Sequence, residues 1–391
     1  MNSAGSDRVK SALLNVGLSV FVALLSACAP VQKKTESAAT DNPFVYPAPP
    51  DEPRFAWERM FISSLDVTGK SEDSRLKEAL TGVSGGGGET LSKPYAVAAF
   101  QGRIYVSDTG DRSVKVFDVP NRKYFRITES SKGLLGKPLG LDVDAKGNLY
   151  VADATNRTIW VFDRDGKPLR SIGDGKQFDR LSSVSVNPEG TRLYAVDIGG
   201  VQSENHRVRV FDAVTGSHLM DIGKRGGGSG EFNLPRDLAV GKDGRLYVVD
   251  GGNFRVQIFD RDGKYISSFG KVGKMLGDFS RPKEIAADPQ GNVYVADSAF
   301  GNFQIFSPDG ELLMFVGERS ESNGPAKYML PSGVFVDEDG RVYMVDQWFR
   351  KVDVFRPYAL PAGGGAFKTI DKSDVAAKSS ADGVSRDEKK Q

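Results

Sequence analysis

The chain has 391 residues, of which 39% are hydrophobic and 26% are charged, so it can form a packed core and is not a wholly disordered protein. Its 52 Lys and Arg residues balance 51 Asp and Glu residues, which argues against a protein that holds nucleic acid by bulk positive charge. One cysteine excludes an intrachain disulfide framework, and two histidines exclude a three-histidine metal centre.

The N-terminus, residues 1–27, has the features of a secretory signal peptide. Arg8 and Lys10 precede an apolar stretch, residues 11–24, that is too short to span a membrane. The stretch is followed by Leu25-Ser26-Ala27-Cys28, which resembles the bacterial lipobox, where the cysteine thiol accepts a diacylglyceryl group. We therefore expect a lipoprotein that is anchored to the membrane through Cys28. The alternative is an ordinary signal peptide with a chance cysteine.

The residues after the cysteine bear on location and on flexibility. Ala29 stands where an aspartate would favour retention in the inner membrane of a Gram-negative cell. We therefore expect a location in the cell envelope, with the outer membrane favoured. Residues 28–53 are rich in Pro, Ala, Ser and Thr and show no periodicity, which predicts a lipidated, disordered tether.

Six copies of one pattern occupy most of the remaining chain. Each copy has a Tyr-x-x-Asp motif, and a phenylalanine that ends a second apolar run follows it. Successive tyrosines lie 45, 44, 53, 47 and 49 residues apart. The six motifs are Tyr105/Asp108, Tyr150/Asp153, Tyr194/Asp197, Tyr247/Asp250, Tyr294/Asp297 and Tyr343/Asp346.

Each copy predicts four short strands. In the fourth, alternating apolar residues and turn signals place strands at 237–240, 245–250, 255–260 and 264–269. Four antiparallel strands in a period of about 45 residues are typical of a propeller blade. The absence of helical patterns between the strands argues against an α/β fold.

The repeats resemble a known family. The run that starts at Pro235-Arg-Asp-Leu-Ala-Val and ends at Asn253-Phe-Arg-Val-Gln-Ile-Phe-Asp is similar to the NHL repeat, and the resemblance covers residues 94–357. It implies an all-β fold, a six-bladed β-propeller of four-stranded antiparallel blades. The amidating lyases that resemble this family use a histidine-bound metal at the channel, and this chain lacks those residues.

The two ends of the repeat region predict how the ring closes. The sixth repeat lacks a fourth strand, and residues 54–65 have strand-like apolar content. We expect these residues to be the outer strand of the last blade, because an open blade would expose unpaired edge groups. The propeller then spans residues 54–358, with a loop and short helix at 66–93. Residues 359–391 are predicted to be a disordered tail.

Catalytic motifs do not fit their surroundings. Residues 82–86 match G-x-S-x-G, but without the strand and helix that this motif requires. His206 and His218 are expected on opposite faces of the third blade, so they cannot share a metal ion. The aspartates of the repeated motif suggest calcium, but their regular position favours a structural role in turns.

Function is expected where the repeats differ. At the start of the first strand, blades four and five carry Arg236-Asp237 and Lys283-Glu284, where the other blades carry mainly small or apolar residues. These charges edge the central channel. They can pair with each other, or they can form a polar site for a small ion or a peptide end.

Aromatic residues follow the second strands of the same blades. Phe254, Phe300, Trp348 and Phe349 lie on the face that also carries the charged positions. Aromatic side chains near an arginine are typical of protein-binding hot spots. Phe254 aligns with Arg112, Arg157 and His206, so its position can also be one of packing between blades.

The sequence therefore predicts a lipid-anchored scaffold of the cell envelope. We expect it to be a monomeric ring within a complex, to bind a protein or peptide partner through the loop face of blades 4–6, and to bind no nucleic acid and no cofactor. The alternative is a channel-centred hydrolase or lyase that uses a divalent metal held by Asp237 and Glu284, so enzymatic activity stays open.

Overall fold

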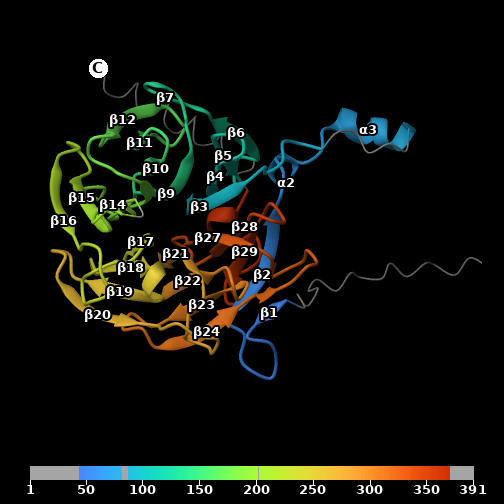
Figure 1. Ribbon diagram of the computed structural model, residues 1–391. Coiled ribbons are helices and arrows are strands. Elements are labelled where there is room, and N and C mark those ends of the chain that lie inside the picture. Colours follow the sequence, from blue (N-terminus) through green and yellow to red (C-terminus); the bar gives the residue numbers. More distant parts are fainter. Residues whose placement is uncertain (1–43, 82–86, 201, 370–391) are drawn as a thin grey trace, which may run out of the picture. The chain divides into compact units, whose positions relative to one another are not determined.

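Six antiparallel sheets are arranged as the blades of a propeller (Figure 1). The computed structural model describes residues 44–81, 87–200 and 202–369, all of which belong to one compact unit. The all-β class and the six four-stranded blades that the sequence predicts are confirmed. Within the described ranges, no helix is both long and apolar enough to cross a membrane.

Strands run from the channel outwards in every blade. The first three blades are β3 (Pro94–Phe100), β4 (Arg103–Asp108), β5 (Ser113–Asp118) and β6 (Lys123–Ile127); β9 (Pro138–Val143), β10 (Leu149–Asp153), β11 (Thr158–Phe162) and β12 (Pro168–Ile172); and β13 (Leu181–Val186), β14 (Arg192–Asp197), β15 (Arg207–Asp212) and β16 (His218–Ile222). The last three are β17 (Pro235–Val240), β18 (Leu246–Asp250), β19 (Arg255–Phe259) and β20 (Tyr265–Phe269); β21 (Pro282–Ala287), β22 (Val293–Asp297), β23 (Asn302–Phe306) and β24 (Leu312–Val316); and β27 (Pro331–Val336), β28 (Val342–Asp346), β29 (Lys351–Pro357) and β2 (Phe55–Phe61).

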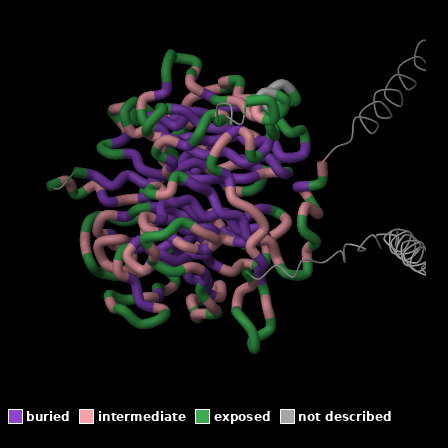
Figure 2. The backbone as a smooth tube through the Cα atoms, turned by 90° about the vertical axis from the view of Figure 1, so that its right-hand side faces the viewer, coloured by how far each residue is buried: buried purple, intermediate pink, exposed green. Residues whose placement is uncertain are grey.

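Burial follows the position of a strand in its blade. All five residues of β18 are buried, because a second strand lies between two others and is covered on both faces by neighbouring blades. The outermost strand β20 alternates between half-buried and exposed residues up to Phe269. Figure 2 shows the same distribution, with buried residues inside and exposed residues in the loops.

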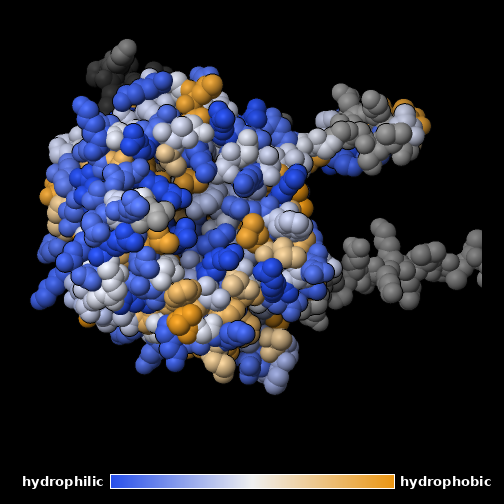
Figure 3. All heavy atoms as spheres, in the orientation of Figure 1, coloured by the Kyte–Doolittle hydropathy of each residue, from blue (hydrophilic) through white to orange (hydrophobic). Residues whose placement is uncertain are grey.

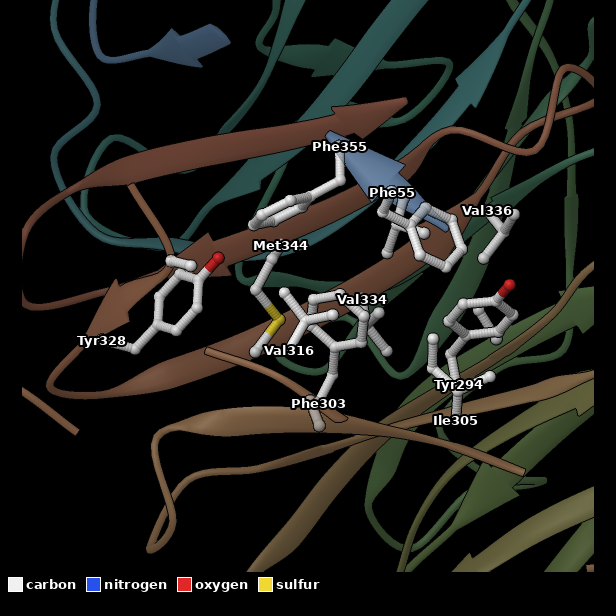
Figure 4. Close-up of a cluster of buried hydrophobic side chains, with 14 residues drawn as sticks. Phe55, Tyr294, Phe303, Ile305, Val316, Tyr328, Val334, Val336, Met344 and Phe355 are labelled. Carbon is white, nitrogen blue, oxygen red and sulfur yellow. The ribbon is translucent and has the colours of Figure 1, made fainter. Parts of the chain in front are cut away.

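The N-terminal strand completes the last blade, as predicted. β2 pairs antiparallel with β29, and Phe61 lies opposite Val352. Phe55 brings its ring to 6.4 Å from that of Tyr294 in the fifth blade. Figure 4 shows Phe55 beside Phe355 within a cluster that joins the fifth and sixth blades. The closing strand therefore contributes both backbone pairing and core packing.

The repeated aspartates shape turns, as their regularity predicts. Asp108 accepts hydrogen bonds from the backbone N–H groups of Ser92, Lys93 and Gly110, at 2.7, 2.9 and 3.0 Å. These bonds tie the start of the first strand to the end of the second. All six aspartates are 0% exposed, so they act inside the fold and not at its surface.

Two segments expected to be disordered contain ordered residues. Val45–Tyr46 form β1, which pairs with β2, and the Tyr46 ring lies 5.7 Å from that of Phe355. At the other end, the 3-10 helix η2 (Gly365–Phe367) buries Phe367 to 2% exposure. Single aromatic residues anchor both segments, whereas the prediction averaged composition over many residues.

Short elements occupy the loops. Before the first repeat lie α2 (Leu65–Thr68) and α3 (Glu72–Thr81), where the sequence predicted a loop with one short helix at 66–93. The other short elements are β7 (Glu129–Ser130), β8 (Gly133–Leu134), η1 (Gly251–Asn253), β25 (Glu318–Arg319) and β26 (Lys327–Tyr328). The predicted signal peptide, the tether up to residue 43, Cys28 and the tail from residue 370 lie outside the described residues.

Candidate binding face at the channel mouth

All the predicted binding residues lie on one side of the propeller. The strands of a blade run antiparallel, so the loops that lead into first strands and the loops that join second to third strands emerge on the same side. We call this side the loop face. Arg236, Asp237, Lys283 and Glu284 lie at the start of first strands, and Phe254, Phe300, Trp348 and Phe349 lie in the second-to-third-strand loops.

The two channel carboxylates link neighbouring blades. Asp237 is 6% exposed; its Oδ1 accepts a hydrogen bond from the Ser183 hydroxyl at 2.5 Å, and its Oδ2 accepts one from the Ile285 N–H at 2.9 Å. Glu284, also 6% exposed, accepts a backbone hydrogen bond from Val334 of the sixth blade. Both carboxylates therefore tie first strands together around the channel.

Burial also changes how readily these carboxylates ionise. It raises the pKa of Asp237 to about 6, against the hydrogen bonds from Ser183 and Ile285 that lower it. Burial and then the charge of Asp237 raise the pKa of Glu284 well above its usual range. Among the described residues, neither carboxylate has a Lys or Arg partner within 4.0 Å, so the ion pairs between adjacent blades, one of the two alternatives that the sequence left open, do not form.

The cations of these two motifs are left without acidic partners. Arg236 is exposed and Lys283 half-buried, and within the described chain neither forms an ion pair. Burial, followed by the charges of Arg281 and Arg236, lowers the pKa of Lys283, against the opposing effect of Glu284. Each motif therefore places an unpaired cation near the start of a first strand.

Four further cations, which the sequence prediction missed, occupy equivalent places. Each stands immediately before the first strand of its blade, is exposed, and makes no ion pair with a described carboxylate; they are Lys93, Lys137, Arg180 and Arg281. The signal was present in the sequence, since aligning the residue before each first strand gives Lys or Arg in four of the six repeats. The prediction compared only the positions inside the strands.

The four predicted aromatic residues differ in exposure. Trp348 is 64% exposed, whereas Phe254, Phe300 and Phe349 are half-buried. Phe254 packs partly against the core of blades four and five, and its φ of +56° places it in the left-handed region that Arg112 and Arg157 also adopt. Its position is therefore one of packing and turn geometry, which leaves Trp348 as the freely displayed aromatic.

Further apolar side chains on the loop face come from the connection between β20 and β21. Met275 is 73% exposed, Val272 66% and Leu276 59%. The sequence prediction did not single them out. Figure 3 shows the molecule in the view of Figure 1, with mainly hydrophilic side chains and a few small hydrophobic groups among them.

Comparison with known proteins agrees with the repeat pattern. The family model of the NHL repeat matches residues 135–162 and 232–259, within blade two and blade four together with the loops that lead into them. The chain carries NHL repeats. It is 27% identical over 191 residues to NHL repeat-containing protein 3 of Mus musculus, an alignment that covers 43% of this chain and 51% of that protein.

Two further proteins are similar to parts of this chain. Peptidylglycine alpha-amidating monooxygenase of Rattus norvegicus is 29% identical over 152 residues, which cover 35% of this chain and 15% of that enzyme. A solved structure of hydrazine synthase from Kuenenia stuttgartiensis shares the fold, with a TM-score of 0.52, 19% identity, and coverage of 70% of this chain and 86% of that one. The NHL chain spans about half the length, or less, of the curated relatives that it matches.

The channel of the NHL propeller contains a cavity of about 320 Å³. First strands of all six blades line it, and Asp237 and Glu284 are among the lining residues. Within the described ranges, no group of three or more His, Cys, Asp or Glu residues is placed to hold a metal ion. The oxygen atoms of Asp237 are instead acceptors for the two neighbouring blades.

The two histidines of the NHL propeller are used locally. His206 is buried, and its Nδ1 accepts a hydrogen bond from the Leu234 N–H at 3.1 Å. The Nε2 of His218 lies 2.7 Å from Oδ1 of Asp221. His206 is in a loop of the loop face and His218 begins β16 after a turn on the opposite side, so the expectation that they do not share a site agrees with the structure.

Proposed function

We propose that this NHL propeller is a docking scaffold that binds a protein or peptide partner through the loop face of blades 4–6. The observation that carries the proposal is the combination of an exposed tryptophan, Trp348, with exposed and unpaired cations on one face. Large aromatic side chains and arginines dominate the energetics of protein interfaces. Propellers of NHL repeats typically serve as protein-interaction scaffolds.

The proposal includes attachment to the cell envelope. The lipobox-like sequence before Cys28 and the short apolar stretch ahead of it support a lipid anchor. Such an anchor would hold the ring at a membrane surface, where a rigid face can collect a partner from the envelope.

The experiment is a capture assay with the full chain, solubilised in detergent from the membranes of its host. The variant Trp348→Ala/Arg236→Ala should lose the partner that the wild type retains. The control is Lys146→Ala/Lys264→Ala, because both lysines are exposed in turns on the opposite side and make no ion pair with a described residue. A partner that binds both variants equally would contradict docking through the loop face.

The alternative function is a hydrolase or lyase centred on the channel. The raised pKa values of Asp237 and Glu284 favour it, because perturbed carboxyl groups beside a cavity are typical of catalytic sites. Their hydrogen bonds to neighbouring blades favour the structural role instead. Metal analysis of the captured protein separates the two: a tightly held divalent ion and no partner would favour the enzyme.

A further inference from the structure

The most unusual feature of the loop face is a set of six cations around the starts of the first strands. We call it the cationic collar; its members are Lys93, Lys137, Arg180, Arg236, Arg281 and Lys283. They come from blades one to five, at or next to the start of the first strands that line the channel. None of the six forms an ion pair with a described carboxylate, and five of them are exposed.

Electrostatic effects show that collar residues from different blades act on one space. The charges of Arg236 and Arg281 reach the amino group of Lys283 in blade five. The hydroxyl of Tyr95 in blade one is influenced first by the charges of Glu284 and Asp237 and then by those of Arg236 and Arg180. Cations from blades three, four and five therefore face a common region, and an anion placed there would interact with several of them at once.

The nearest carboxylates offset the collar only in part, since Glu284 acts on Lys283 without forming an ion pair with it. Asp237 and Glu284 lie just inside the channel but are buried, and burial raises the pKa of both. Their oxygen atoms accept hydrogen bonds from neighbouring blades, which fixes both carboxylates among the inner strands. The six collar cations thus make no ion pair with a described carboxylate, and they can interact with an external anion.

Resting on the proposed function, we infer that the collar recognises an acidic peptide segment of the protein partner. The carboxylates of the segment would lie among the collar cations, and its apolar side chains would contact Trp348 and the exposed Met275 and Leu276. Charge complementarity of this kind sets partner choice and the rate of association.

Two features favour a peptide over a nucleic acid. The collar cations are arranged in a ring around the starts of the inner strands of five blades, whereas proteins that bind single strands usually track the backbone along an extended basic groove. The formal net charge of the whole chain is only +1, so the long-range attraction for a polyanion is weak. A short acidic segment needs only the local field of the collar.

The test measures fluorescence polarisation of a fluorescein-labelled hexaglutamate peptide with the detergent-solubilised full chain at low ionic strength. We expect binding that weakens with added salt and by about tenfold or more in Arg236→Glu/Arg281→Glu. Both side chains are exposed, and circular dichroism confirms that the variant is folded. The matched control Lys146→Glu/Lys264→Glu reverses two charges on the opposite side and should change the affinity by less than about twofold.

Each other outcome overturns the inference. Equal loss in the two variants would show non-specific attraction, and equal binding of a hexaglutamine peptide would show that carboxylates are not recognised. Tighter binding of hexauridylate than of hexaglutamate, lost in the collar variant, would make the collar a nucleic-acid site.

The inference can fail while the scaffold proposal stands. A partner that is lost on Trp348→Ala but kept on Arg236→Glu/Arg281→Glu would leave docking through the loop face intact and remove the role of the collar. A partner that binds Trp348→Ala and Arg236→Glu/Arg281→Glu as well as it binds the wild type would contradict the scaffold proposal itself.

Discussion

Ser183 of the third blade donates a hydrogen bond to Asp237 of the fourth, with 2.5 Å between the two oxygen atoms. The same carboxylate accepts the N–H of Ile285 in the fifth blade, so one side chain joins three blades. Similar links occur around the channel: Asp142 accepts from Ser185, and the Ser332 hydroxyl donates to the Tyr95 carbonyl. Polar residues that the sequence marks as a possible site therefore also hold the inner ring together.

The raised pKa of Asp237 predicts a pH dependence of stability. Burial raises this pKa from its ordinary 3.8 to about 6, so between these pH values the folded protein binds a proton that the unfolded chain has lost. Stability must then fall as the pH rises through this window, by roughly 3 kcal/mol at most for a shift of about two units. Asp237→Asn removes this effect. The free energy of unfolding of the variant, measured in urea, should therefore increase relative to that of the wild type as the pH rises from 4 to 7.

A carboxyl group with the opposite shift provides the control. Hydrogen bonds from Thr215 lower the pKa of the half-buried Asp212, so its contribution is present above the ordinary pKa and is lost as the pH falls. The free energy of unfolding of Asp212→Asn should therefore decrease relative to that of the wild type as the pH rises. If Asp237→Asn behaves in the same way, the Asp237 carboxylate is stabilised in the fold and our account of the channel is wrong.

Arg341 predicts a large loss of stability at the closing blade. Its guanidinium is fully buried and pairs with Glu58 of the closing strand at 2.8 Å and with Asp339 at 2.6 Å. Arg341→Met would leave the Glu58 carboxylate, whose side chain is 2% exposed, without its partner. We expect a loss of about 3–5 kcal/mol in the free energy of unfolding, measured in urea.

The second change in this test is Glu58→Gln. Combined with Arg341→Met, it removes the uncompensated charge and should recover part of the lost stability. The exposed pair Lys70–Glu78 sets the scale for a surface contact, because Lys70→Met should cost less than about 1 kcal/mol. Equal costs for Lys70→Met and Arg341→Met would show that the buried pair does not support ring closure.

Trp348 should contribute little to folding if it serves binding. At 64% exposure, its replacement in Trp348→Ala is expected to change the free energy of unfolding by about 0.5 kcal/mol or less. Trp160, at 2% exposure, provides the comparison, and Trp160→Ala should cost about 3–5 kcal/mol. The melting temperatures of the two variants are measured by calorimetry. If Trp348→Ala lowers the melting temperature as much as Trp160→Ala does, Trp348 has a packing role.

The lipid anchor is tested by Cys28→Ala. Metabolic labelling with a fatty acid should mark the wild type and leave the variant unlabelled, because the thiol is the attachment point. A variant that still carries the label would show that the anchor assignment is wrong. If the unlabelled variant is found in the soluble envelope fraction, the protein is still exported and has lost only its membrane attachment.

The periodic part of the fold was predictable because every repeat contains the same pattern of residues. Tyr-x-x-Asp marks the second strand in each copy, and the missing fourth strand of the last repeat indicated the partner of residues 54–65. The ordered Tyr46 and Phe367 were missed, because each depends on one aromatic contact that segment composition does not reveal.

The candidate site was predicted less completely. The contrast between repeats found the motifs of Arg236 and Lys283 and left two roles open for them, ion pairing between blades or a polar site. The structure gives their neighbours Asp237 and Glu284 hydrogen bonds to the next blade and no ion pair. The partners of these carboxylates depend on how the inner strands of neighbouring blades are aligned, and a single sequence does not show which inner strands lie side by side. Exposure, which separates Trp348 from Phe254, also depends on tertiary packing.

The placement of the closing strand has a kinetic consequence. β2 is made before any repeat, yet its partner β29 comes last; the hydrogen bond from the Trp57 indole to Asp353 spans 296 positions. The ring can close only when the whole repeat array is present, and contacts between such distant residues slow folding. Until then β2 exposes an unpaired edge and the aromatic face of Phe55, which is the stage at which this protein is most exposed to aggregation and to the help of a chaperone.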